Sequence, residues 1–202
     1  MIGFQKRKGV LLVVDLDYTL VEVNTVYDFL EKFYSRRFLL ISRLLFPLLF
    51  FNRLLKTDIY KQLLVTYCFK NVSEQCLRNS ARTYFNYILR HRDRYLNQSV
   101  LEILLRQDDT TTKMLLTASL SIIAEQFKEL GFDLVISSKT FFKNGKYSGM
   151  FDIFMKKHRI LGCFSKYFDQ IIIFDDDPEP EYNNIKNTEV RVIKVHGGAC
   201  QQ

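Results

Sequence analysis

Five consecutive apolar residues, Val10 to Val14, run without a polar break into Asp15 and Asp17. An unbroken run of Val and Leu predicts a strand that is buried on both faces, as in the middle of a parallel sheet. The stretch QIIIFDDD, residues 170–177, repeats this design, because its apolar run also ends in carboxylates. Further apolar runs predict strands at residues 113–117, 132–138 and 190–195.

Helical periodicity marks the chain between the predicted strands at residues 10–14 and 113–117. One helix face is predicted by the i, i+3, i+4, i+7 spacing of four apolar residues, Val26, Phe29, Leu30 and Phe33, with Asn24 or Thr25 as the cap. Further helices are predicted at residues 58–69, 73–90 and 92–106, and another after Ser119 that ends at Gly131. Strands that alternate with helices predict an α/β fold with a parallel sheet, and Asn144-Gly145 predicts a hairpin within it.

The carboxyl ends of the predicted strands carry the candidate chemistry. In open α/β sheets ligands bind beyond these ends, so Asp15 and Asp17 are expected beside a ligand. Two carboxylates this close raise each other's pKa unless a cation lies between them, and Mg²⁺ is the hard cation that oxygen ligands favour. Thr117, Ser119 and Ser121 lie where a strand turns into a helix, and hydroxyls beside free N–H groups at a helix start predict a phosphate site.

Four stretches together resemble the motifs of the haloacid dehalogenase (HAD) superfamily of phosphohydrolases, in its phosphoserine-phosphatase-like branch, subfamily IB. In chain order they are DLDYTL from Asp15, LLTAS at residues 115–119, Lys157 with Leu161 four residues later, and IIIFDD at residues 171–176. The resemblance implies an α/β fold with a HAD-type, Rossmann-like parallel sheet as its core, at residues 1–21 and 110–202. It also implies a helical cap domain, residues 22–109, inserted after the first strand.

The resemblance further implies catalytic roles. It makes Asp15 the nucleophile and Asp17 the acid/base, with Thr19 closing the loop beside the substrate. It gives Thr117 the contact to the phosphate, with Ser119 nearby. It makes Lys157 the residue that screens the charge of Asp15 and of the phosphoryl oxygens, with Lys156 as the near alternative.

A magnesium site is implied by the same resemblance. Its ligands would be Asp15, the backbone carbonyl of Asp17 and one residue of the run Asp175 to Asp177. Asp176 is the favoured residue of this run, and Asp175 is the second choice. The branch carries a second Asp four residues further on, where this chain has Pro180. Glu179 or Glu181 would have to replace that carboxylate.

The implied function is Mg²⁺-dependent hydrolysis of a small phosphorylated metabolite through an aspartyl-phosphate intermediate. The phosphomonoester itself stays open. Phosphoserine is disfavoured, because phosphoserine phosphatases carry an acidic residue nine positions after the nucleophile, where this chain has Asn24. The alternative is a HAD-fold protein that binds a membrane surface or a partner and has weak or no phosphatase activity.

Composition narrows the classes of partner. The chain has 202 residues and a formal net charge of +7, which suits an anionic ligand or surface but is too dispersed to predict nucleic-acid binding. The 4 cysteines have no metal-ligand spacing and predict reduced thiols in a cytoplasmic protein. The oligomeric state is left open by these features.

The stretch from Phe38 to Leu55 is the most apolar part of the chain. It nearly reaches the length of a membrane span, but Arg43, Pro47 and Arg53 interrupt it. Buried or partly exposed cap helices are the favoured interpretation, and a surface for peripheral contact with a membrane or a partner is the alternative.

Overall fold

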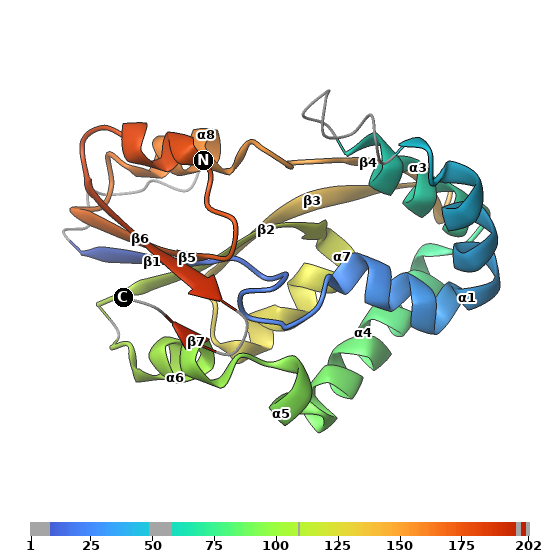
Figure 1. Cartoon of the computed structure of the whole chain (residues 1–202), viewed down its shortest axis with the longest axis horizontal. Coiled ribbons are helices and arrows are strands. Elements are labelled where there is room, and N and C mark those ends of the chain that lie inside the picture. Colours follow the sequence, from blue (N-terminus) through green and yellow to red (C-terminus); the bar gives the residue numbers. More distant parts are fainter. Residues whose placement is uncertain (1–8, 49–57, 109, 197–198, 201–202) are drawn as a thin grey trace.

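Strand β1 (Val10–Val14) lies in the middle of a 7-stranded sheet with the order β4-β3-β2-β1-β5-β6-β7 (Figure 1). The computed structural model describes residues 9–48, 58–108, 110–196 and 199–200. The strands that run parallel are β1, β2 (Thr112–Leu120), β3 (Leu134–Lys143), β5 (Gln170–Asp175) and β6 (Glu189–His196). The two edge strands are β4 (Lys146–Phe151) and β7 (Ala199–Cys200), and each is antiparallel to its neighbour.

The alternating side chains of β1 enter two separate cores, as expected of a strand buried on both faces. Leu12 and Val14 belong to the larger core, and Leu11 and Val13 to the smaller one. Figure 1 shows α8 (Lys157–Phe164) on one face of the sheet and α6 (Gln98–Arg106) and α7 (Ser121–Ala124) on the other. The predicted α/β fold with a parallel sheet is therefore confirmed.

The order of the strands creates a switch point beside β1. After β1 the chain builds β2 and β3 on one side, then crosses through α8 to build β5 and β6 on the other. Two short 3-10 helices complete these connections, η1 (Glu125–Leu130) and η2 (Pro180–Asn184). Ligands bind at such a switch point because the connections leave the carboxyl ends of the strands in opposite directions and open a crevice.

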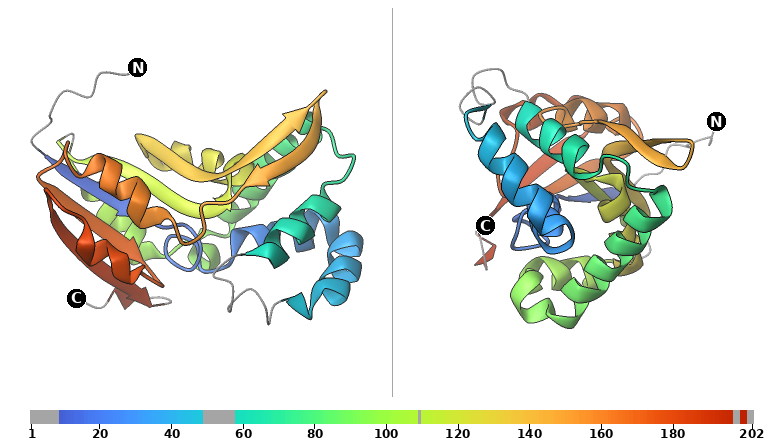
Figure 2. Two further views of the ribbon diagram at one scale, coloured as in Figure 1. Left: turned by 90° about the horizontal axis from the view of Figure 1, so that it is seen from above. Right: turned by 90° about the vertical axis from the view of Figure 1, so that its right-hand side faces the viewer.

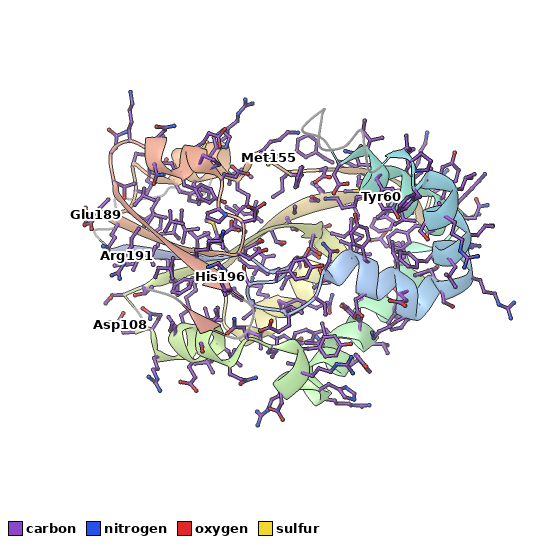
Figure 3. The ribbon with its side chains drawn as sticks, viewed as in Figure 1. Tyr60, Asp108, Met155, Glu189, Arg191 and His196 are labelled. Atoms are coloured by element: carbon purple, nitrogen blue, oxygen red, sulfur yellow. The ribbon has the colours of Figure 1, made fainter. Side chains whose placement is uncertain are left out.

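Helices make up the regular structure described between β1 and β2. They are α1 (Thr25–Leu45), α3 (Ile59–Cys68), α4 (Glu74–Arg90), α5 (Arg92–Tyr95) and α6. The side chains of Asn24, Asp58 and Ser73 each accept a backbone N–H at a helix start, so the cap of the first helix is Asn24 and not Thr25. Figure 3 shows Tyr60 of α3 and the pair Glu189 and Arg191 of β6 toward opposite ends of the long axis.

The prediction of a single helix over residues 92–106 is wrong. The chain is extended at Leu96 and Asn97, and the Asn97 side chain starts α6 by accepting the Val100 N–H at 3.3 Å. The break lets this segment pair with the chain that leaves β1: Asn97 N donates to Leu20 O at 3.0 Å, and Glu22 N donates to Tyr95 O at 2.9 Å. The division into domains at residues 1–21, 22–109 and 110–202 stays a prediction.

The predicted hairpin at Asn144-Gly145 is confirmed, and it extends beyond the sheet. Both residues have positive φ, 52° and 69°, as a two-residue hairpin turn requires. Glu74 N donates to Gly145 O at 2.8 Å, and Tyr147 N donates to Val72 O at 3.1 Å. Figure 2 shows the two strands of the hairpin reaching the helices. The hairpin therefore joins the sheet to the helices by backbone hydrogen bonds.

An aromatic cluster forms the interior of the helical part. Phe29 is fully buried, and its ring centroid lies 5.5 Å from that of Tyr84 and 6.2 Å from that of Phe69. Tyr147 of the hairpin packs edge-on against Phe69 at 5.4 Å. The Tyr84 hydroxyl donates to Asp28 Oδ2 at 2.8 Å, so its polar end is paired despite its burial.

The apolar stretch Phe38–Leu55 is described as far as Leu48. In this part Leu45 is buried, whereas Leu40 and Leu44 are more than 70% exposed, at 73% and 77%. Phe50, Phe51 and Arg53 lie outside the described residues. Within the part of the chain that the structure describes, no helix has the length and apolar character needed to cross a membrane.

Candidate active site

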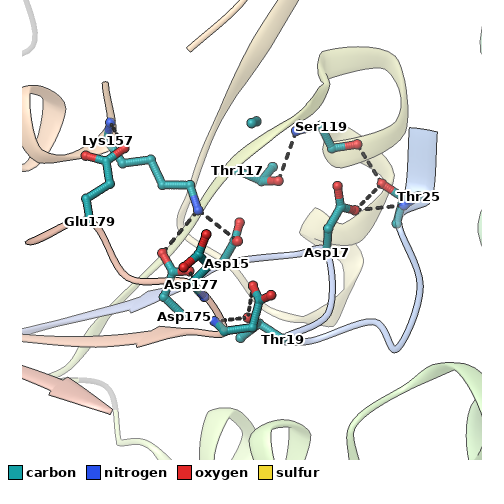
Figure 4. A network of polar contacts seen from close by, with 12 residues as sticks. Asp15, Asp17, Thr19, Thr25, Thr117, Ser119, Lys157, Asp175, Asp177 and Glu179 are labelled. Atoms are coloured by element: carbon teal, nitrogen blue, oxygen red, sulfur yellow. Dashed lines mark hydrogen bonds and ion pairs between the residues drawn. The ribbon is translucent and has the colours of Figure 1, made fainter. Parts of the chain in front are cut away.

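Asp15 follows β1 directly and lies beside β5. Its backbone N–H donates to Phe174 O at 2.9 Å, so the carboxylates of Asp15 and Asp175 stand next to each other at the sheet edge. Lys157 Nζ lies 2.8 Å from Asp15 Oδ2 and 3.1 Å from Asp175 Oδ2 (Figure 4). The other oxygen of Asp15, Oδ1, is buried and has no hydrogen-bond partner among the described residues.

Glu179 holds Lys157 in this position. Its carboxylate accepts the backbone N–H groups of Lys157 at 3.1 Å and of His158 at 2.9 Å. It also lies 2.6 Å from His158 Nδ1. Two of the unpaired N–H groups at the start of α8 are thereby satisfied by a side chain distant in sequence. Lys156, the alternative to Lys157, points elsewhere, because its Nζ donates to Asp152 O at 3.2 Å.

Asp17 is held by the start of α1. Its Oδ1 accepts the backbone N–H of Thr25 at 2.8 Å and the Thr25 hydroxyl at 2.6 Å. The same hydroxyl lies 2.6 Å from Ser119 Oγ. These contacts, visible in Figure 4, fix the Asp17 carboxylate apart from the Lys157 ammonium group. Ser119 thus contacts the residue that orients Asp17.

Thr117 lies at an irregularity of β2 that opens the strand toward the site. The register with β3 jumps between Thr117 and Leu120, so Ala118 and Ser119 have no partner on β3. The Thr117 side chain accepts the backbone N–H of Ser119 at 3.0 Å and lines the pocket. The hydroxyl of Thr19 has a different environment, because it accepts the Asp176 N–H at 2.9 Å. Its predicted substrate contact stays a prediction.

The run Asp175 to Asp177 divides into three environments. Asp175 is 2% exposed, and its oxygens accept from Lys157, from the Tyr182 hydroxyl at 3.0 Å and from Asp177 N at 3.1 Å. Asp176 is partly buried, and Asp177 is exposed. Among the described residues, Asp15, Asp175 and Asp176 each offer an oxygen within 4.8 Å of the others, as a cation site requires.

Burial separates these carboxyl groups from ordinary surface acids. It raises the pKa of Asp15 to about 7, because the lost hydration outweighs the attraction of Lys157. Burial also raises the pKa of Asp17, against the hydrogen bonds from Thr25, and that of Asp176, to which neighbouring Asp175 adds. Burial lowers the pKa of Lys157, but the charges of Asp15 and Asp175 outweigh it and raise that pKa. Lys157 therefore stays a cation at the site.

A pocket of about 280 Å³ lies over these groups. The helical part contributes Asn24, Asp58 and Lys61 to its wall, and the segment before α8 contributes Phe154 and Met155. Met155 and Tyr18, which also lines the pocket, have positive φ, 57° and 58°, so the backbone is strained on both sides. The volume suits a small ligand.

A buried ion pair joins the helices to the sheet at the edge of this pocket. Lys61 Nζ lies 2.8 Å from Asp152 Oδ2, and both side chains are nearly inaccessible. Lys61 also donates to Ala118 O at 3.3 Å, the carbonyl next to Thr117. Ser138 Oγ lies 2.8 Å from the same carbonyl oxygen and 2.9 Å from Asp152 Oδ1. One polar network therefore fixes both α3 and the irregular end of β2.

Replacing Lys61 by Met is expected to lower the free energy of unfolding by about 3 kcal/mol, because Asp152 then stays buried without its cation. The double variant K61M/D152N should recover a large part of this loss, since neither charge remains. Urea denaturation measures both values. Arg106→Met, which removes an exposed pair with Glu102, serves as the control and should cost less than about 1 kcal/mol. Equal losses in the single and double variants would contradict the pairing.

The structure thus brings Asp15, Asp17, Thr117 and Lys157 to one pocket, together with Asp175 and Asp176. Sequence reasoning missed three contributors, Thr25, Lys61 and Asp152, and it proposed Glu179 only as a substitute for a missing Asp. Thr25 follows a helix cap in sequence, which is a signal for position but not for a contact to Asp17. Lys61 and Asp152 are 91 residues apart and carry no pattern that would connect them.

Comparison with known proteins agrees with the fold and with the family that the motifs indicate. The family model described as haloacid dehalogenase-like hydrolase matches residues 12–162, well over half of the chain. No curated protein matches the sequence.

Solved structures share the fold at low sequence identity. A protein of unknown function from Bordetella pertussis Tohama I is 16% identical, with a TM-score of 0.66, over 91% of this chain and 98% of that one. A phosphoserine phosphatase in apo form is 14% identical, with a TM-score of 0.55, over 93% and 84% of the two chains. Cytosolic 5′-nucleotidase IIIB bound to cytidine is 13% identical, with a TM-score of 0.56, over 95% and 73%.

Proposed function

Because this chain belongs to the haloacid dehalogenase-like hydrolases, we propose that it is a Mg²⁺-dependent phosphomonoester hydrolase that forms an aspartyl-phosphate on Asp15. One observation carries the proposal: the buried Asp15 carboxylate has one oxygen on Lys157 and the other without a partner, while Asp17 is held separately by Thr25. Two neighbouring carboxylates in different environments suit the two roles that the reaction needs.

In the first step Asp15 attacks phosphorus, the bond from phosphorus to the ester oxygen breaks, and Asp17 gives its proton to the leaving oxygen. In the second step the Asp17 carboxylate takes a proton from water, and this water attacks phosphorus and releases Asp15 and inorganic phosphate. The raised pKa of Asp17 favours the protonated form that starts the cycle. Lys157 holds Asp15 and stabilises the charge that develops on the phosphoryl oxygens.

Electrostatics supports a divalent cation at this site. The described residues that line the pocket include seven carboxyl side chains and two lysines, and such an excess of negative charge would repel a phosphate dianion. The unpartnered Asp15 Oδ1 and an oxygen of Asp176 fit the oxygen ligands that Mg²⁺ takes, with the Asp17 backbone carbonyl proposed as a third. When bound, Mg²⁺ neutralises phosphoryl charge and keeps Asp15 ionised. Asp175 is proposed as a support, because its oxygens already accept three hydrogen bonds.

Asp176→Asn is expected to raise the Mg²⁺ concentration for half-maximal rate by about 10-fold or more, because a charged ligand becomes neutral. Asp177→Asn is the matched control in the same run. It should change that concentration much less, since Asp177 is exposed and outside the oxygen cluster. Magnesium titrations of the two variants measure the difference. The reverse order would move the ligand from Asp176 to Asp177.

The size and charge of the pocket support the proposed substrate class. A volume of about 280 Å³ supports a small phosphorylated metabolite. Asn24 is neutral, and its side-chain oxygen already accepts Tyr27 N at 3.2 Å, so this position offers no carboxylate to a substrate amine. This disfavours phosphoserine, although phosphoserine phosphatases are among the proteins of similar fold. A panel of phosphorylated metabolites, tested with and without Mg²⁺, would identify the substrate.

We also propose that residues 22–109 form a helical cap over the core of residues 1–21 and 110–202. Asn24, Asp58 and Lys61 supply one wall of the pocket from the helical side, as expected of a lid that excludes water and contacts the substrate. Magnesium-dependent hydrolysis of a generic aryl phosphate tests the whole proposal. The absence of turnover with both aryl phosphate and the metabolite panel would favour the alternative of a binding protein.

A further inference from the structure

The halves of α1 before and after Tyr34 differ in how many of their side chains are buried. The first half buries Val26, Phe29 and Leu30, whereas Leu45 is the buried residue of the second half. Tyr34, between the halves, has the non-helical angles φ −132° and ψ 29°. The kink therefore separates a half that packs on the aromatic cluster from a half with one buried side chain, whose other core contacts come from partly buried residues such as Phe38 and Ile41.

Large apolar side chains are exposed on this second half. Leu39, Leu40, Leu44 and Phe46 are 53%, 73%, 77% and 68% exposed. Isolated exposed leucines are ordinary, but four large apolar side chains within eight positions form a patch that indicates an interaction site.

Two arginines lie within the same patch. Arg36 and Arg43 are exposed, and their spacing from Leu39, Leu40 and Leu44 places them on the same side of the helix. Neither guanidinium group has a hydrogen bond or an ion pair with another described residue. Arg37 differs, because it donates to the carbonyls of Cys68 and Lys70. The α1 surface is defined here as Arg36, Leu39, Leu40, Arg43, Leu44 and Phe46.

The segment of the chain that carries the α1 surface has charges of one sign. The sequence has no Asp or Glu from residue 32 to residue 57, whereas the carboxylates of the pocket lie elsewhere in the chain. Apolar side chains with cations alone are complementary to anionic lipid, where leucines enter the interface and arginines meet the headgroups. A two-fold contact between copies would instead bring the arginines of both α1 surfaces together without an acidic partner.

We propose that the α1 surface docks this protein on an anionic membrane. The proposed contact is peripheral, through side chains on one side of the helix. None of the described helices has the length and apolar character needed to cross a bilayer. In the right-hand view of Figure 2, α1 lies on the side of the molecule that faces the viewer. This side is one end of the long axis. The proposal is independent of the catalytic function, because it is tested by binding without turnover.

The test is sedimentation of the full chain with vesicles of equal parts phosphatidylglycerol and phosphatidylcholine, or of phosphatidylcholine alone. One variant pair removes apolar contact, Leu40→Ser with Leu44→Ser, and another removes charge, Arg36→Gln with Arg43→Gln. Leu105→Ser on α6, where Leu105 is 63% exposed, is the apolar control. Arg92→Gln with Arg94→Gln on α5 is the control with the same change of net charge.

We expect the wild type to bind the anionic vesicles in preference to the neutral ones. Each α1 pair should weaken that binding at least about tenfold, and the controls should match the wild type. Melting curves identify any pair that fails to fold, in which case the other pair decides. Absence of wild-type binding, or α1 variants that bind like the controls, would overturn the proposal. Self-association that the α1 pairs abolish, without vesicle binding, would assign the surface to contact between copies.

Discussion

Asp15→Asn is expected to reduce turnover of any phosphomonoester by at least about 10³-fold, the scale on which removal of a nucleophile acts. An amide cannot attack phosphorus to form the acyl phosphate. The fold should persist, because Asn is nearly isosteric with Asp and Lys157 keeps its contact to Asp175. Steady-state kinetics on an aryl phosphate, with circular dichroism melting in parallel, measures both effects.

Asp169→Asn is the matched control for this variant. Asp169 is exposed and precedes β5, so it lies at the edge of the sheet opposite to Asp15. Its neutralisation should leave the rate unchanged. Residual activity of Asp15→Asn above about a hundredth of the wild type, with deamidation excluded by mass spectrometry, would remove Asp15 from the nucleophilic role.

Asp17→Asn is expected to slow hydrolysis by about 10²- to 10⁴-fold, the usual contribution of a positioned acid/base. The loss should depend on the leaving group. An alkyl alcohol needs a proton as it departs, whereas an aryl alcohol with a low pKa does not, so alkyl phosphates should lose more rate. The amide oxygen can still accept from Thr25, which keeps the side chain in place.

The ratio of the two losses decides the role of Asp17. Equal losses for aryl and alkyl phosphates would show that Asp17 does not protonate the leaving group. Thr25→Ser provides a check on positioning, because it keeps the hydroxyl that binds Asp17 and Ser119. This variant should retain most of the activity with both kinds of substrate.

The sheet could be predicted from the sequence because its signals are local. The apolar run of β1, the carboxylates that follow it and the Asn144-Gly145 turn each need only a few neighbouring residues. The break before α6 could not be predicted in this way. Leu96 and Asn97 leave the helix to pair with residues 20–22, and this competition between helix and tertiary contact is absent from the local pattern.

The candidate site also combines features with a local sequence signal and features that depend on distant segments. The positions of Asp15, Asp17 and Lys157 follow from motifs, although their roles stay predictions. The contacts that orient them come from distant segments: Thr25 holds Asp17, and Glu179 holds the backbone of Lys157. A carboxylate that accepts two N–H groups at a helix start can lie anywhere in the sequence, because only the fold brings it there.

The hairpin between β3 and β4 also has a mechanical consequence. Its backbone bonds to residues 72 and 74 attach the helices to the sheet at a point distant from the paired segments 20–22 and 95–97. A body attached at separated points cannot swing about a simple hinge. Any wide opening of the pocket must therefore break the hydrogen bonds donated by the backbone N–H groups of Glu74 and Tyr147, or bend the hairpin together with the helices. Bending is the less disruptive of the two motions, because it keeps the contact between the Tyr147 and Phe69 rings. The hairpin and the helices would then move together as one rigid unit.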